Sequence, residues 1–167
     1  SANIENAVEG AYWAAFGTAG QRCTSLGNLI LHEEIYDEFM EKFMTKVKET
    51  KIGDSLRHED VLYGPMLSEK YANDFLRDLG MCESDGATKL WGEGLITDEN
   101  KPGNFLGEAS EGSYMWPHVY EGVKEDMRCF HEEIFGPVVT VVRAVDFNDA
   151  LRLANASPFG LSSACYT

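Results

Sequence analysis

The sequence predicts an α/β fold with a mainly parallel sheet flanked by helices. Short apolar runs alternate with segments whose apolar residues recur at helical spacing. The run 138–142 (VVTVV) is β-branched without polar alternation, which is typical of a strand covered on both faces. The chain has 167 residues, of which 44% are hydrophobic, and this is enough for one domain with its own core.

The first helix is predicted directly after Asn3, a good N-cap residue, because apolar residues recur at helical spacing over residues 4–14. Gly17 and Gly20 are expected to end this helix. Cys23 therefore follows a helix and a glycine-rich turn.

The run 29–31 is predicted to be a strand. The residues from 35 to 47 place aromatic and aliphatic side chains on one face and acids and lysines on the other, which indicates an amphipathic helix. We expect the apolar residues from 36 to 43 to lie in the core.

A further helix is predicted to begin after Ser68 and to end near Gly80. Its buried face is expected to hold Tyr71, Phe75, Leu76 and Leu79. Residues 88–91 are predicted to form a short strand. Residues 92–113 are rich in Gly, Glu, Asp and Asn, so we expect a surface loop there.

Pro137 precedes the buried valine strand, and Asp146 is predicted to cap the next helix. The apolar residues of that helix are Phe147, Ala150, Leu151 and Ala154. Leu161–Tyr166 is predicted to be a final strand. Because it reaches Thr167 without a polar ending, we expect the chain to be part of a longer one.

Composition disfavours two classes of partner. The formal net charge is −14 and the acids are spread through every segment, so the chain would repel a nucleic-acid backbone. The longest apolar runs are too short to span a bilayer, and no basic and apolar leader begins the sequence. We therefore expect a soluble, cytoplasmic protein that binds neither nucleic acid nor membrane.

The four cysteines lie far apart and form no C-x-x-C pair or Cys/His pattern, so no metal site is expected. They are Cys23, Cys82, Cys129 and Cys165. A reduced setting fits this spacing best, although an even number of cysteines also leaves two disulfides open.

Cys23 is the first candidate for chemistry. It lies in segment 17–25 (GTAGQRCTS), where small residues leave the backbone free and Arg22 is its neighbour. A nearby positive charge favours a thiolate over a thiol, so Cys23 is a candidate nucleophile. The alternative is a buried structural cysteine, which is the more frequent role of a lone cysteine.

The second candidate is the segment His131–Pro137 (HEEIFGP), which leads into the valine strand. Loops at the strand ends of a parallel sheet are where ligands usually bind. A solvated acidic turn is the alternative, and spacing alone does not decide between the two.

Together, Gly20–Ser25 (GQRCTS) and Glu132–Val138 (EEIFGPV) resemble the nucleophile and cofactor-ribose signatures of the aldehyde dehydrogenase superfamily. They occur in the family's order and at about its separation. Shorter matches agree in order: Ile52–Asp54, Gly64–Met66 and Phe159–Ser162. The resemblance covers essentially the whole chain but only roughly a third of a family member.

The resemblance implies a mechanism. Cys23 is the thiolate that attacks an aldehyde carbon to give a thiohemiacetal, which is oxidised to a thioester and hydrolysed to a carboxylic acid. The Cys23 backbone N–H is one oxyanion donor. Glu133 accepts hydrogen bonds from the nicotinamide-ribose hydroxyls and Phe135 packs near the ring. The cofactor is NAD or NADP, because this ribose is common to both.

The resemblance also implies what is missing. The family's general-base glutamate, its oxyanion asparagine and its pyrophosphate loop are expected to precede Ser1. Residues 1–167 are then the catalytic, nucleophile-bearing domain of a longer chain, with the cofactor-binding domain absent and the isolated piece inactive. The full enzyme is expected to be a homo-oligomer acting on a small-molecule aldehyde, which the sequence does not identify.

Two other functions remain open at this point. In one, the chain is a non-catalytic interaction module with a structural cysteine. In the other, it is a cysteine hydrolase, which would need His131 to activate Cys23.

Overall fold

The computed structural model describes residues 2–167. The helices are α1 (Ile4–Phe16), α2 (Tyr36–Lys48), α3 (Glu69–Ser84), α4 (Arg128–His131) and α5 (Phe147–Ala156), with 3₁₀ turns η1 (Gly17–Gly20), η2 (Glu33–Ile35) and η3 (Ala109–Glu111). The strands are β1 (Asn28–His32), β2 (Ile52–Gly53), β3 (Thr88–Trp91), β4 (Phe105–Leu106), β5 (His118–Glu121) and β6 (Val138–Ala144). None of these helices is long and apolar enough to cross a bilayer.

The main sheet has the strand order β1-β6-β5-β3. β6 pairs in parallel with both β1 and β5, and β3 joins β5 antiparallel at the edge. β2 and β4 form a separate parallel pair. The predicted mainly parallel α/β sheet is therefore confirmed.

β6 is one of the two inner strands of the sheet and is buried along most of its length. Val139 and Val141 are almost fully buried, and so are Val138 and Val142 on the other side of the strand. This agrees with the absence of polar alternation in the sequence, because a strand covered on both faces has no solvent side.

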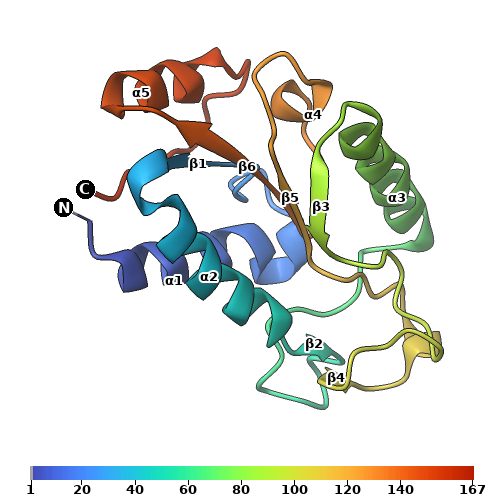
Figure 1. Ribbon diagram of the computed structural model, residues 1–167. Coiled ribbons are helices and arrows are strands. Elements are labelled where there is room, and N and C mark those ends of the chain that lie inside the picture. Colours follow the sequence, from blue (N-terminus) through green and yellow to red (C-terminus); the bar gives the residue numbers. More distant parts are fainter. Residues whose placement is uncertain (1) are drawn as a thin grey trace.

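Helices flank the sheet as predicted. Figure 1 shows α1 and α2 side by side, α5 beside β1 and β6, and α3 beside β3. The rings of Phe16 in α1 and Phe43 in α2 stack with centroids 6.1 Å apart, and Phe39 stacks on Phe43. This aromatic cluster confirms that the apolar residues from 36 to 43 belong to the core.

The helix after Ser68 is longer than expected and presents a different face. α3 runs through Gly80 to Ser84, because Met81 and Cys82 continue its apolar side. The side chain of Tyr71 is 41% exposed, and Ala72 is buried in its place. The buried positions repeat every three to four residues: Ala72, Phe75, Leu79 and Cys82. The buried face of α3 therefore begins at Ala72, one residue after the predicted Tyr71.

The region 92–113 is mostly loop, but it contains β4 and η3. β4 forms because Leu106 lies directly against Gly53 of β2, where an added Cβ would come within 1.9 Å of the Leu106 carbonyl oxygen. The turn-rich composition of this region gave no sign of β4, because β4 forms only by pairing with β2, which is distant in sequence.

The C-terminal region departs most from expectation. Asp146 does cap α5, because its Oδ1 accepts a hydrogen bond from the Asp149 N–H at 2.8 Å. However, Phe147 and Leu151 are more than half exposed, and Leu153 is the buried residue. The predicted strand 161–166 is wrong: this segment is irregular and exposed and pairs with no described strand.

Candidate active site

The two candidate segments lie together because of the sheet topology. Segment 17–27 leads into β1 and segment 132–137 leads into β6. β1 and β6 are parallel neighbours, with Asn28 opposite Thr140. The loops that enter two parallel neighbours lie at the same edge of a sheet. Pairing of β1 with β6 therefore brings two segments together that are separated by about a hundred residues.

The turn before Cys23 has an unusual backbone. Thr18, Ala19 and Gly20 have φ values of 55°, 56° and 63°, a left-handed conformation that is unfavourable for the first two residues. The Thr18 hydroxyl donates to the Gly17 carbonyl oxygen at 2.6 Å and accepts from Arg22 Nε at 2.7 Å. These bonds keep the tight turn and direct the Arg22 side chain back along it.

Cys23 follows this turn and is exposed, with a free thiol. Its backbone N–H donates no hydrogen bond to any of residues 2–167. The neighbouring backbone is fixed, since Ser25 N–H donates to the Arg22 carbonyl oxygen and Leu26 N–H donates to the Ala14 carbonyl oxygen of α1. An exposed thiol thus stands on an anchored loop, next to a backbone N–H that has no acceptor in the described part of the chain.

Gly20 and Gly136 join the two segments by direct backbone contact. A Cβ added to Gly20 would lie 2.0 Å from the Gly136 carbonyl oxygen. A Cβ added to Gly136 would lie 2.2 Å from the ring of Phe75 in α3. Neither position has room for a side chain, so the glycines set the spacing between the segments and the start of β6.

The structure places the other two predicted site residues in the same segment. Glu133 is exposed, and Phe135 is partly buried. Phe135 lines an open hollow of about 370 Å³ whose other lining residues are Thr18, Gln21, Pro65, Leu67 and Tyr71. The Gln21 side chain fixes one wall, because its Oε1 accepts from the Leu67 N–H at 2.9 Å. The hollow thus lies between the Cys23 turn and the start of α3.

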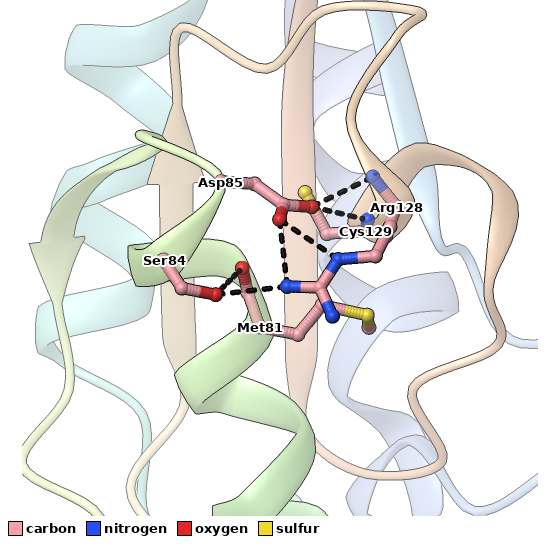
Figure 2. Close-up of polar contacts among 5 residues, drawn as sticks. All are labelled: Met81, Ser84, Asp85, Arg128 and Cys129. Atoms are coloured by element: carbon pink, nitrogen blue, oxygen red, sulfur yellow. Dashed lines mark hydrogen bonds and ion pairs between the residues drawn. The ribbon is translucent and has the colours of Figure 1, made fainter.

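The other end of the Glu133 segment is anchored through α4. Asp85 caps this short helix with Oδ2, which accepts from the backbone N–H groups of Arg128 at 2.6 Å and of Cys129 at 3.3 Å (Figure 2). Asp85 Oδ1 accepts from the Arg128 guanidinium at 2.8 and 3.0 Å, and Arg128 also donates to Ser84 Oγ. The Arg128 guanidinium holds the pKa of the Asp85 carboxyl below its usual value.

His118 lies in the core, on β5. It is 1% exposed, its ring stacks on Tyr120, and Phe75 meets it edge-on. Its Nε2 accepts from the Gly94 N–H at 3.1 Å. Burial lowers the pKa of His118 to about 4, so the ring is neutral at physiological pH.

His131, the residue that a cysteine hydrolase would need, is engaged elsewhere. Its Nε2 lies 2.5 Å from the Glu125 carbonyl oxygen, and its ring meets Phe130 edge-on. No hydrogen bond joins His131 to Cys23 in the described part of the chain.

Sequence reasoning missed several residues that shape the site. Gln21 and Tyr71 line the hollow, although Tyr71 was expected in the core. Asn28 is a polar residue at the head of the apolar run 29–31, a position where a strand gains little from it. A polar residue at the start of an apolar strand is therefore the sequence feature that could have identified Asn28.

Comparison with known proteins gives one consistent family. A family model described as "Aldehyde dehydrogenase family" matches residues 1–167. An alpha-ketoglutarate semialdehyde dehydrogenase of Haloferax volcanii is 35% identical over 168 residues, which is 100% of this chain and 32% of that protein. An alpha-ketoglutaric semialdehyde dehydrogenase of Bacillus subtilis is 34% identical, covering 99% of this chain and 32% of the relative.

Solved structures agree. A betaine aldehyde dehydrogenase of Staphylococcus aureus in complex with NAD+ superposes with a TM-score of 0.86 and 30% identity, covering 96% of this chain and 30% of that one. An NAD-dependent benzaldehyde dehydrogenase of Corynebacterium glutamicum superposes with a TM-score of 0.81 and 33% sequence identity. The match covers 99% of this chain and 33% of that one. The chain spans about a third of the length of the curated relatives that it matches.

Proposed function

Because the chain belongs to the aldehyde dehydrogenase family, we propose that it is the nucleophile-bearing domain of an NAD- or NADP-dependent enzyme that oxidises an aldehyde to a carboxylic acid. One observation carries the proposal: the exposed thiol of Cys23 stands on a strained, anchored turn that packs directly against the segment of Glu133 and Phe135. Strained backbone of this kind is retained where the surrounding structure holds it for a function.

The residues present fit the nicotinamide half of a dinucleotide. Glu133 offers an exposed carboxylate that is able to accept hydrogen bonds from two ribose hydroxyls. Phe135, Leu67 and Pro65 give the neighbouring hollow an apolar lining suited to an aromatic ring. When bound, the nicotinamide supplies the hydride acceptor.

Cys23 carries the covalent chemistry in this proposal. Its thiolate adds to the aldehyde carbon, and the carbonyl oxygen becomes an oxyanion that the Cys23 backbone N–H stabilises. Loss of hydride from that carbon leaves a thioester on Cys23. Water then adds to the thioester, and the carbon–sulfur bond breaks to release the acid and regenerate the thiol.

The remaining parts of the site are assigned to chain outside these 167 residues. The described segments offer no glutamate placed as a base for water and no loop for the pyrophosphate among the residues lining the hollow. We therefore propose that the isolated 167 residues do not oxidise aldehydes. The aldehyde, the cofactor preference and the assembly of the whole enzyme are open in this proposal.

Removal of Cys23 tests the function. In the full-length enzyme, Cys23→Ala is expected to lower aldehyde oxidation at least ~10³-fold, because no other group replaces the nucleophile. Cofactor affinity should stay within about twofold, since Cys23 is not proposed to hold the dinucleotide. Cys165→Ala is the matched control, because Cys165 is the other exposed thiol. Equal activity of the two variants would refute the proposal.

Alkylation gives a second test with an internal reference. Brief iodoacetamide treatment followed by mass spectrometry compares the four thiols in one sample. Cys82 and Cys129 are buried and should react slowly, so the informative comparison is Cys23 against Cys165, which is also exposed. We expect preferential labelling of Cys23. Equal labelling of both exposed thiols would favour an interaction module with an ordinary surface cysteine.

A further inference from the structure

The segment that carries Glu133 is attached to the segment that carries Cys23 at both of its ends. At one end, Gly136 lies against Gly20, which precedes Cys23. At the other end, the Phe130 carbonyl oxygen accepts a hydrogen bond from Asn28 Nδ2 at 2.9 Å, and Asn28 follows Cys23. Cys23 lies between the two attachment points on one segment, and Glu133 and Phe135 lie between them on the other.

The Asn28 side chain is itself held in one orientation. Its Oδ1 accepts from Thr140 Oγ1 at 2.5 Å, and this leaves the amide nitrogen directed at Phe130. Thr140 is 3% exposed, and its backbone N–H also donates to the Gly27 carbonyl oxygen at 2.9 Å. The amide therefore donates and accepts at once, and the Phe130 carbonyl oxygen, which can only accept, fixes Nδ2 as the donating end.

A carboxylate or an aliphatic residue at position 28 would not replace this bond, because neither donates a hydrogen bond to a carbonyl oxygen. Phe130 is 2% exposed and lies near the C-terminal end of α4, which ends at His131, two residues before Glu133. A carbonyl group that loses its donor in such a place must find another partner or move. Asn28 thus fixes the path of the chain three residues before Glu133.

We infer that Asn28 is a positioning residue: through its bond to the Phe130 carbonyl oxygen it holds the Glu133–Phe135 segment in the arrangement that receives the nicotinamide ribose. This inference rests on the proposed function, since it concerns the same cofactor. Asn28 does not touch the cofactor and acts through the backbone of residues 130–136.

Asn28→Asp in the full-length enzyme removes the hydrogen-bond donor to the Phe130 carbonyl oxygen and keeps the size and shape of the side chain. The variant keeps the acceptor for Thr140 but places a carboxylate oxygen against the Phe130 carbonyl oxygen. Hydrogen–deuterium exchange should be at least ~10-fold faster for the amides of Phe130 and Glu132, which donate to the Met127 and Arg128 carbonyl oxygens in the turn that Asn28 anchors. The dissociation constant and KM for the dinucleotide should rise about five- to tenfold, with kcat changed less than about twofold.

Asn104→Ala is the matched control. Asn104 Nδ2 also donates to a backbone carbonyl group far away in sequence, that of Thr50 at 2.8 Å, but at the β2–β4 end of the molecule. It should speed exchange near residues 50 and 104 and leave the Phe130 and Glu132 amides and the dinucleotide constants unchanged. If Asn28→Asp does not fold, Asn28→Ala, which removes donor and acceptor without adding charge, takes its place.

The outcomes are distinct. Unchanged exchange of the Phe130 and Glu132 amides in the Asn28 variants, or equal effects of the Asn28 and Asn104 variants on dinucleotide affinity, overturns the inference. A wild-type enzyme that binds neither NAD nor NADP overturns the proposed function and the cofactor role of Asn28 with it. The exchange measurement needs no cofactor, so it identifies which of the two has failed.

Discussion

At the scale of single residues, neighbouring side chains of the same type have different expected roles. Glu132 and Glu133 are adjacent and both exposed. The backbone N–H of Glu132 still closes the α4 turn by donating to the Arg128 carbonyl oxygen at 2.8 Å, whereas Glu133 follows in irregular chain. Adjacent carboxylates therefore offer a direct test of the proposed ribose contact.

Glu133→Gln in the full-length enzyme is expected to raise the dissociation constant of the dinucleotide about tenfold or more, because hydrogen bonds to a carboxylate are stronger than bonds to an amide. Isothermal titration calorimetry measures this constant. Glu132→Gln removes the same charge one residue away and should change it less than about twofold. Similar losses in both variants would indicate general electrostatics instead of a ribose contact.

His118 gives a prediction about pH. Its pKa is lowered to about 4 by burial, while in the unfolded chain it is about 6.5. Between these values the unfolded chain binds a proton that the folded chain does not, so stability falls as the pH drops from 6.5 toward 4. The contribution of His118 is a loss of roughly 2 kcal/mol at pH 5 relative to pH 7.5.

Urea unfolding of the wild type and of His118→Phe at both pH values measures this loss. The phenylalanine variant keeps an aromatic ring beside Phe75 and Tyr120 but cannot titrate. Its stability should therefore depend less on pH than that of the wild type, whatever its absolute value. Parallel pH dependence of the two proteins would show that His118 does not titrate in this range.

At the scale of elements, the site depends on how two loops are spaced. The contact between Gly20 and Gly136 leaves no room for a side chain, and Gly20 also has a positive φ. Strain and steric conflict therefore coincide at Gly20. The two effects are separable, because Gly122 has a similar φ of 70° but nothing within 4 Å of an added Cβ.

Gly20→Ala is expected to lower stability by roughly 1–3 kcal/mol, to change the alkylation rate of Cys23, and to weaken dinucleotide binding, because the two loops must separate. Gly122→Ala should cost only about 1 kcal/mol of backbone strain and leave the thiol unaffected. Urea unfolding and timed iodoacetamide labelling measure these effects. Unaltered Cys23 reactivity in Gly20→Ala would contradict the proposed coupling of the loops.

Secondary structure was predictable where a segment carries its own signal. α1 and α2 begin and end near the predicted residues, because an N-cap or a strong apolar stripe lies within each. The faces of α3 and α5 were partly wrong, since two adjacent apolar residues such as Tyr71 and Ala72 do not reveal which one meets the core. Helical spacing shows that a helix has an apolar face, but tertiary packing decides which of the neighbouring apolar residues that face buries.

At the scale of the whole molecule, apolar side chains near the C-terminal end are left uncovered. Phe147 and Leu151 on α5 are 61% and 51% exposed, and Phe159 and Leu161 beyond it are 58% and 66% exposed. Single exposed apolar residues are ordinary, but several on consecutive segments indicate a surface that meets another protein surface. The same surface explains why the sequence predicted burial there.

We expect the 167-residue chain to self-associate and to bind an apolar fluorescent dye through this surface. Sedimentation and dye fluorescence of Phe147→Ser/Leu151→Ser should both show less association and less binding than the unaltered chain. Leu56→Ser is the control, because Leu56 is 97% exposed in a loop that is distant in sequence from α5. A monomeric chain without dye binding would contradict the prediction.

The sequence by itself determined the α/β class, most of the helices and strands, and the two motifs around Cys23 and Glu133. These depend on local spacing and residue type, which are present in any short stretch of chain. Only the tertiary structure decided that the motifs touch through Gly20 and Gly136, that Asn28 joins them, and that segment 161–166 is not a strand. Contacts across a hundred residues depend on which strands pair and which surfaces are covered, and no local pattern contains that information.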